Sequence, residues 1–222
     1  MFNFPGRAAR EVPTIPTTTP PTATVAAAPV GTGPKRRRVG REGILQAAQD
    51  LFAQKGYAAT STRDIADAVG IRQPSLYSHF ASKAEILLDI LLITVEPPVA
   101  RAEELAADPS LDPQQRLLAL IDFDVQLLAS DRRNKGLLYL FPELDEEVFD
   151  AFRTRYDRLR GFYRSFILAA AVDDGRPLRG EALVGVALSM IEAVVVRRIY
   201  ESDLEPDVVV AQTRAAIERL VF

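Results

Sequence analysis

The sequence contains no cysteine and no tryptophan, and His79 is its single histidine. Without cysteine, disulfide bonds, thiolate catalysis, iron–sulfur clusters and cysteine-ligated zinc sites are excluded. One histidine cannot form a histidine-rich metal site, and we expect no metal and no cofactor. No apolar run reaches the roughly 18 residues that a transmembrane helix needs, so no membrane partner is expected. These absences predict a soluble protein of the cytoplasm.

Charge is divided unevenly along the 222 residues. Residues 35–84 hold nine Lys/Arg and four Asp/Glu, a net charge of +5, whereas residues 85–222 sum to −9. Clustered cations are the electrostatic footprint of nucleic-acid binding, and an acidic body would face away from a phosphate backbone. At this point two interpretations are open: a basic module that binds a polyanion, or a chance asymmetry on a solvated surface.

The first 34 residues contain seven of the fifteen prolines. Proline removes backbone donors and breaks both helix and ladder, so we expect residues 1–34 to form a disordered tail, either a tether or the product of an upstream start codon. A basic run follows, which is either an arm lying along DNA phosphates or a solvated segment before a helix. The module after it favours the arm. The run consists of Lys35, Arg36, Arg37 and Arg38.

From Gly40 onward the apolar residues recur with helical periodicity, and no strand or hairpin is indicated, so the chain is predicted to be all-α. Pro97–Pro98 is expected to break or kink the chain, with a separate short helix after it. The predicted helices are Ile44–Phe52, Thr62–Val69, Pro74–Phe80, Ser82–Val95, Val99–Ala107, Pro113–Ser130, Arg133–Leu140, Asp145–Ala171, Gly180–Tyr200 and Pro206–Leu220.

The turn Val69-Gly70-Ile71-Arg72 joins two of the short helices, with apolar residues on both sides. A helix, a turn that contains glycine and a second short helix form the helix-turn-helix pattern, whose second helix enters the DNA major groove. The residue types in this region also indicate which family of helix-turn-helix proteins the chain resembles. Across Gly43–Leu87 the chain resembles the TetR family of bacterial transcription regulators, in K-G-Y, T-R-D-I-A, V-G-I, L-Y-S-H-F and S-K-A-E-I-L.

This resemblance implies a helix-turn-helix DNA-binding domain over residues 35–83 and a larger helical domain over 84–222 for effector binding and dimerisation. Hydroxyl groups and helix N-termini suit phosphate oxygens. A cation in the first turn of a helix is disfavoured by the helix dipole, so a phosphate partner would explain Lys83. The resemblance implies phosphate contacts for Thr62, Tyr77, His79 and Lys83.

The helix after the turn carries side chains suited to base edges. A glutamine amide pairs with adenine, a hydroxyl donates or accepts, and an arginine pairs with guanine or binds phosphate. For any single side chain, plain surface polarity competes with base contact. The family uses the matching positions for base readout, which here are Gln73, Pro74 and Ser75, with Arg63 from the preceding helix; Arg72 stands beside them.

The helix over Gly180–Tyr200 is apolar around most of its circumference and therefore needs cover on two sides. We expect it to form a dimer interface with the last helix, as the resemblance also implies; an ordinary monomer core is the alternative. The interface residues predicted from this pattern are Val184, Ala187, Ile191, Val195, Ile217 and Leu220.

Aromatic residues recur on the middle helices, where they either line an apolar ligand pocket or simply fill the core. Three charged residues could anchor a polar ligand group or be solvated, namely Arg153, Arg160 and Glu192. The pocket residues predicted are Phe123, Leu127, Tyr139, Phe152, Tyr156, Tyr163 and Met190.

The favoured hypothesis is a homodimeric repressor that binds a near-palindromic operator in double-stranded DNA and is released by an unknown small apolar or amphipathic effector. A constitutive or architectural DNA binder is the alternative. No nucleophile–base pair, phosphate-binding glycine loop or metal-ligand cluster is found, so we expect no enzyme.

Overall fold

The structure is a computed structural model that describes residues 40–130, 147–171, 180–201 and 203–222. All regular elements in these ranges are helical, which confirms the all-α prediction. The helix predicted over Arg133–Leu140 lies outside the described residues. The elements are α1 (Arg41–Lys55), α2 (Thr62–Ala68), α3 (Gln73–Tyr77), α4 (Lys83–Ala107), α5 (Pro113–Ser130), the 3-10 helix η3 (Glu147–Phe149), α6 (Asp150–Ala170), α7 (Gly180–Tyr200) and α8 (Pro206–Val221).

Helices α1, α2 and α3 form a small module around one apolar core. Ile44 and Phe52 of α1, Ile65 of α2, Leu76 of α3 and Phe80 after it are each at most 1% exposed. Removing such side chains from water is the main favourable term in holding short helices together, because helices of five to seven residues are marginal alone. The module therefore depends on its tertiary core rather than on helix propensity.

Local signals set where α2 begins and ends. The Ser61 hydroxyl accepts a hydrogen bond from the Asp64 N–H, and the Asp64 carboxylate accepts one from the Ser61 N–H, which is the predicted capping box. At the other end Gly70 takes a φ of +69°, a conformation that side chains disfavour, and the Ile71 N–H donates to the Ala66 carbonyl. This turn directs α3 away from the axis of α2.

Helix α4 runs without interruption through Pro97 and Pro98, so of the break or kink predicted here the break is wrong. Each proline removes one helical hydrogen bond and crowds the preceding turn. Packing outweighs that local cost, because Pro98 and Val99 are buried and α4 lies against both α5 and α6. The expected separate helix Val99–Ala107 is the second half of α4, which joins the module to the rest of the chain.

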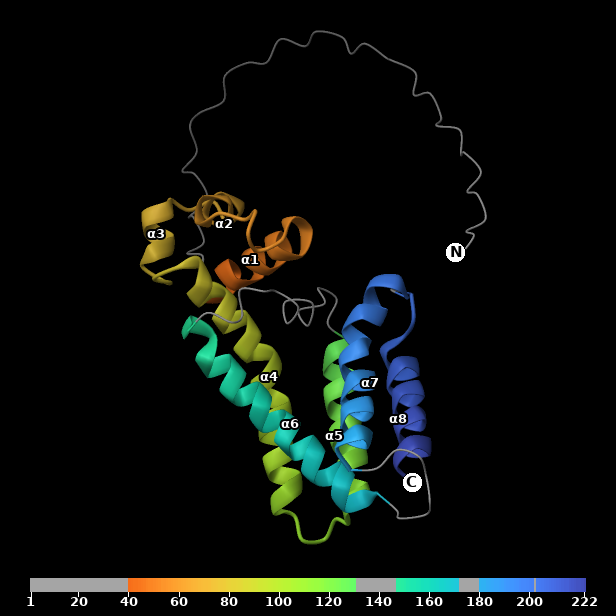
Figure 1. The fold of residues 1–222 in the computed structure, drawn as a ribbon. Helices are drawn as coiled ribbons and strands as arrows, with labels where there is room; N and C mark the ends of the chain where they lie inside the picture. Colours follow the sequence, from red (N-terminus) through yellow and green to blue (C-terminus); the bar gives the residue numbers. More distant parts are fainter. Residues whose placement is uncertain (1–39, 131–146, 172–179, 202) are drawn as a thin grey trace, which may run out of the picture. The chain divides into compact units, whose positions relative to one another are not determined.

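The remaining helices form a body around α5. Helix α5 contacts α4, α6, α7 and α8, and α6 also packs on α4 and α7 (Figure 1). One face of α6 belongs to the core, since Phe152, Leu159, Tyr163 and Phe166 are buried. Among the residues that the structure describes, no helix is both long and apolar enough to cross a membrane.

Candidate nucleic-acid interface

Three polar side chains connect the start of α2 to the recognition helix α3. The Gln73 amide nitrogen donates to the Thr62 hydroxyl at 2.9 Å, and the Thr62 and Tyr77 hydroxyls lie 3.2 Å apart. All three were predicted to contact DNA, and the structure brings them together. The Gln73 amide oxygen and the free lone pairs of the hydroxyls remain for an external partner. These bonds set the orientation of α3 relative to α2.

The other side chains predicted to reach bases lie on the surface. Arg63, Arg72, Pro74 and Ser75 are exposed, and His79 is half-buried at the end of α3. Arg72, which precedes the first residue of α3, makes no side-chain hydrogen bond or ion pair with the described residues. The surface formed by α3 and the turn before it therefore presents exposed polar groups, including the Arg72 guanidinium, to an external partner, as the direct contact of base edges requires.

Lys83 has partners within the chain. Its ammonium nitrogen donates to the carbonyls of Tyr57 and Thr60 at 2.7 and 2.9 Å and lies 4.1 Å from the centre of the Tyr57 ring. Its position in the first turn of α4 is thus explained without DNA. A lysine ammonium has three N–H donors, so one is left for a phosphate. The predicted phosphate contact remains a proposal.

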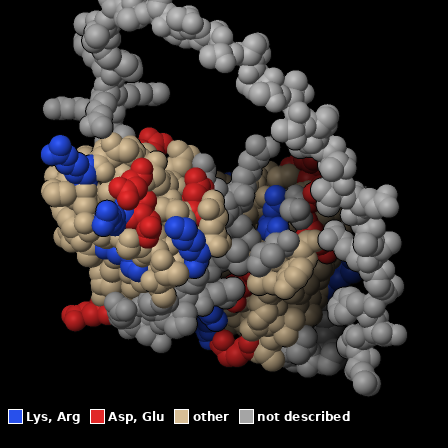
Figure 2. Space-filling view, turned by 90° about the horizontal axis from the view of Figure 1, so that it is seen from above, with Lys and Arg blue, Asp and Glu red and all other residues tan. Residues whose placement is uncertain are grey.

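The face of the module carries both signs of charge. Figure 2 shows Lys/Arg and Asp/Glu side chains interspersed over it. Lys55 and Asp64, and likewise Arg63 and Asp67, are paired only loosely at 3.9 Å. The predicted positive excess therefore rests largely on the run Lys35–Arg38, which lies outside the described residues.

Sequence reasoning missed one cation of this module. Arg41, the first residue of α1, contacts the carbonyl of His79 and the carboxylate of Asp89 on α4. In the sequence Arg41 looks like a continuation of the basic run. No local pattern signals the contact, because Asp89 is 48 positions away.

The predicted pocket residues lie on several helices and differ in exposure. Phe123 is 38% exposed on α5, Met190 lies between α7 and α8, and Tyr139 is outside the described residues. Phe152 and Tyr156 stack with ring centres 5.7 Å apart. The helical periodicity that groups these residues does not show which helix faces which, so the ligand pocket stays a prediction.

Two polar clusters remain in the body. The Tyr156 hydroxyl donates to Glu192 at 2.6 Å, and Arg160 pairs with the same carboxylate at 3.3 Å, so these charges satisfy each other. Burial, reinforced by the Glu192 carboxylate, raises the pKa of Tyr156. Deeper in the core, the Tyr163 hydroxyl donates to the Asp124 carboxylate at 2.9 Å. Burial raises the pKa of Asp124 to about 6, against the lowering effect of this bond.

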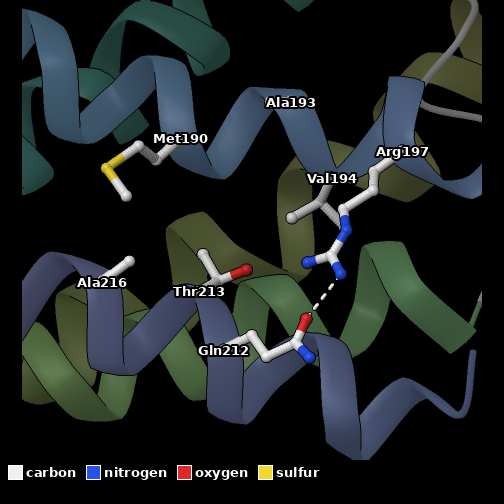
Figure 3. Close-up of a pocket in the computed structure, with 7 residues that line it drawn as sticks. All are labelled: Met190, Ala193, Val194, Arg197, Gln212, Thr213 and Ala216. Atoms are coloured by element: carbon white, nitrogen blue, oxygen red, sulfur yellow. Dashed lines mark hydrogen bonds between the residues drawn. The ribbon is translucent and has the colours of Figure 1, made fainter.

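A groove of about 210 Å³ opens between α7 and α8. Figure 3 shows Met190 and Ala216 facing each other at one end, and Arg197 reaching across to Gln212 at the other. Ala193, Val194 and Thr213 complete the lining. The groove is mostly apolar, and nothing in its lining resembles a catalytic or metal-binding arrangement. Among the described residues, no group of three or more potential metal ligands was found.

Most of the residues predicted to form the dimer interface are buried within a single chain. Five of the six are at most 4% exposed within a single chain, so they already pack on their own core, and Leu220 is half-buried; the five are Val184, Ala187, Ile191, Val195 and Ile217. The opposite face of α7 is exposed and consists of small and apolar residues spaced three and four apart. This α7 stripe is Ala182, Val186, Ser189, Ala193, Val196 and Tyr200.

Comparisons with known proteins agree with this geometry. The profile of the family described as "Bacterial regulatory proteins, tetR family" matches residues 44–90, which include α2 and α3. The chain is 33% identical over 138 residues to the HTH-type transcriptional repressor KstR2 of Rhodococcus jostii, covering 61% of this chain and 66% of that protein. It is 32% identical over 106 residues to the HTH-type transcriptional activator FasR of Mycolicibacterium smegmatis, covering 48% of this chain and 47% of that one.

A solved structure extends the likeness over nearly the whole chain. The crystal structure of Mycobacterium smegmatis AmtR superposes with a TM-score of 0.71 at 38% identity, covering 88% of this chain and 90% of that one. The matched segments span less than two thirds of the length of the two curated relatives, whereas the solved structure is matched almost end to end. The chain therefore belongs to the TetR family of bacterial regulatory proteins.

Proposed function

We propose that the protein is a sequence-specific DNA-binding transcriptional regulator that acts as a homodimeric repressor. The observation that carries the proposal is the exposed polar surface of α3, held against α2 by the bonds among Thr62, Gln73 and Tyr77. A recognition helix must present donors and acceptors in a fixed orientation to read base edges. Arg72, Pro74 and Ser75 then face the bases, and Thr62, Tyr77, His79 and Lys83 lie where phosphates would flank the groove.

A second copy of the chain is the partner that we propose for the α7 stripe. Val186 and Val196 are about 40% exposed, and Tyr200 is 82% exposed. Exposed apolar residues at this spacing are typical of a helix that packs on another helix. A two-fold dimer would place its two recognition helices in successive major grooves, about 34–36 Å apart, and so select a near-palindromic operator.

We propose that a small apolar or amphipathic effector enters the body near α5 and α6. Supporting this, the Asp124–Tyr163 pair places a carboxyl and a hydroxyl in an otherwise apolar core, and a buried carboxyl whose pKa is raised by burial is a candidate functional group. A ligand shifts an equilibrium only by its differential affinity for two states. Helix α4 is the element that both regions share, so it would carry the change to the module.

Repression is favoured over activation by the relatives. The protein named a repressor, KstR2, matches 61% of this chain, whereas the one named an activator, FasR, matches 48%. A dimer that occupies an operator blocks transcription by its presence alone, so repression requires no further contact.

Selection from random DNA followed by footprinting at two salt concentrations tests the proposal. We expect a near-palindromic site whose protection persists at the higher salt, because base contacts depend on salt less than phosphate contacts do. Coating without a boundary, which disappears at higher salt, would instead indicate an architectural DNA binder.

A further inference from the structure

Arg41 joins three parts of the chain with one side chain. Its Nε atom is 2.9 Å from the Asp89 carboxylate on α4, and Nη2 donates to the same oxygen. Its Nη1 atom donates to the His79 carbonyl at 2.6 Å, and the guanidinium carbon lies 4.0 Å above the centre of the Phe80 ring. Arg41 thus connects the start of α1, the end of the recognition helix and α4.

The His79 carbonyl lies just beyond the C-terminal end of α3, where carbonyl groups have no N–H partner within the helix. A guanidinium supplies a charged donor there, and its planar fork reaches the carboxylate at the same time. A lysine has the same charge, but its donors all sit on one nitrogen, so it cannot place two N–H groups on the carboxylate and a third on the carbonyl with the planar geometry of a guanidinium. The arrangement is therefore specific for arginine.

Sequence position alone suggests another role for Arg41, because it follows the basic run that ends at Arg38. In the structure its charge faces Asp89, with Glu85 3.8 Å away, so the cation is already paired. A half-exposed ion pair contributes little to overall stability. What these contacts do instead is set where the end of α3 lies relative to α4.

We propose that Arg41 is a positioning residue that locks the recognition helix to α4, so that a displacement of α4 moves the DNA-reading surface. This inference rests on the proposed function for its consequence on DNA. The lock itself is a property of the free protein and can be measured without DNA.

The test uses Arg41→Lys, which keeps the charge, and Asp89→Ala, which removes an acid. The matched controls are Arg101→Ala and Glu104→Ala, an exposed pair on the same helix α4 at 3.0 Å. For each full-length variant two quantities are measured. One is the affinity for a selected operator duplex and for a random duplex across a salt series, and the other is hydrogen–deuterium exchange of residues 73–82 without DNA.

If Arg41 is the lock, Arg41→Lys and Asp89→Ala each weaken operator binding on the order of tenfold, with the salt slope unchanged, and exchange over residues 73–82 accelerates several-fold. The two controls behave as wild type. The result for Asp89→Ala is decisive, because removing an acid near DNA would strengthen binding if only charge mattered.

The proposal is overturned if Arg41→Lys binds as wild type, Asp89→Ala tightens binding to both duplexes and exchange is unchanged. Arg41 would then be a phosphate contact. If wild type selects no operator, the proposed function fails, and exchange alone decides: faster exchange in both variants upholds the lock, and unchanged exchange rejects it.

Discussion

The DNA-binding module and the helical body hold their cations in different ways. In the module, Lys83 donates to two backbone carbonyls, and the pairs Lys55–Asp64 and Arg63–Asp67 stand at 3.9 Å, too far for a hydrogen bond. In the body, arginines meet carboxylates of neighbouring helices at 3.0 to 3.3 Å, as in Arg158–Glu103, Arg155–Glu96 and Arg160–Glu192.

The difference bears on function because the two kinds of partner act differently on charge. A carbonyl binds a cation without cancelling its charge, whereas a carboxylate cancels it. Within residues 40–84 of the module five Lys/Arg stand against four Asp/Glu, so its positive excess comes mainly from the run Lys35–Arg38. The body instead uses its arginines as cross-links between helices. Arg41 departs from this pattern, since it pairs with Asp89 at the junction of the two regions.

The largest effect is expected from a charge on the α7 stripe. Val196 is 39% exposed, whereas its neighbour Val195 is 4% exposed. Val196→Asp should leave the helical fold intact and convert the proposed dimer to a monomer, because a buried unpaired charge is strongly unfavourable at an interface. Light scattering measures the oligomeric state, and circular dichroism measures the helical content.

The adjacent position is the matched control. Val195→Asp places the same charge in the core of one chain and should unfold the body, by more than about 3 kcal/mol. A Val196→Asp protein that remains dimeric would refute the α7 stripe as the contact face.

The next largest effect is expected on the affinity of the module for DNA. Replacing Lys35, Arg36, Arg37 and Arg38 by alanine should weaken DNA binding on the order of hundredfold at about 0.1 M salt. It should lower the magnitude of the salt slope by up to about four, roughly 0.9 for each phosphate that is no longer neutralised. Binding to operator and random duplexes should weaken equally, because phosphates carry no sequence. An unchanged slope would show that the run is a solvated segment.

A smaller effect concerns the core of the body and depends on pH. Because burial raises the folded-state pKa of Asp124 to about 6, above its ordinary value of 3.8, folding takes up a proton between these two values. The contribution of Asp124 to stability is therefore most favourable below pH 4 and is lost as the pH rises through 6.

Asp124→Asn removes this pH-dependent loss of stability, because an amide does not titrate. The difference in free energy of unfolding, variant minus wild type, should be more positive at pH 7.5 than at pH 4 by roughly 1 to 3 kcal/mol. Urea denaturation of both proteins at the two pH values measures it. Asp157→Asn, an exposed acid on α6, controls for the change in net charge. A difference that does not vary with pH would mean that Asp124 is not titrating in the core.

The smallest effect is confined to one base pair. Gln73→Ala should relax the preference at a single operator position, at a cost of about 1 to 3 kcal/mol, and should also remove the bond to Thr62. Ser78→Ala, which removes only a bond to the Ser75 carbonyl, is the control at the end of α3. Selection from random DNA compares the two. An equal weakening on operator and random duplexes would remove Gln73 from base readout.

The module was predicted well because its signals are local. The Ser61 cap lies three residues from Asp64, and Gly70 marks a turn of a few residues. The body was predicted in outline only. The helix limits of α5 and α7 were correct, but the dimer face was assigned to the buried side of α7, and the break at Pro97–Pro98 did not occur.

The physical reason is the range of the interactions. Periodicity, caps and the helix-turn-helix motif act within a few residues, so the sequence by itself determined the all-α class, the recognition helix and the family. Only the tertiary structure decided which face of α7 is exposed, that α4 continues through two prolines, and that Arg41 contacts Asp89 rather than extending the basic run. A helix that is apolar all round has no period to indicate its buried side, and a contact 48 residues apart exists only when packing brings its ends together.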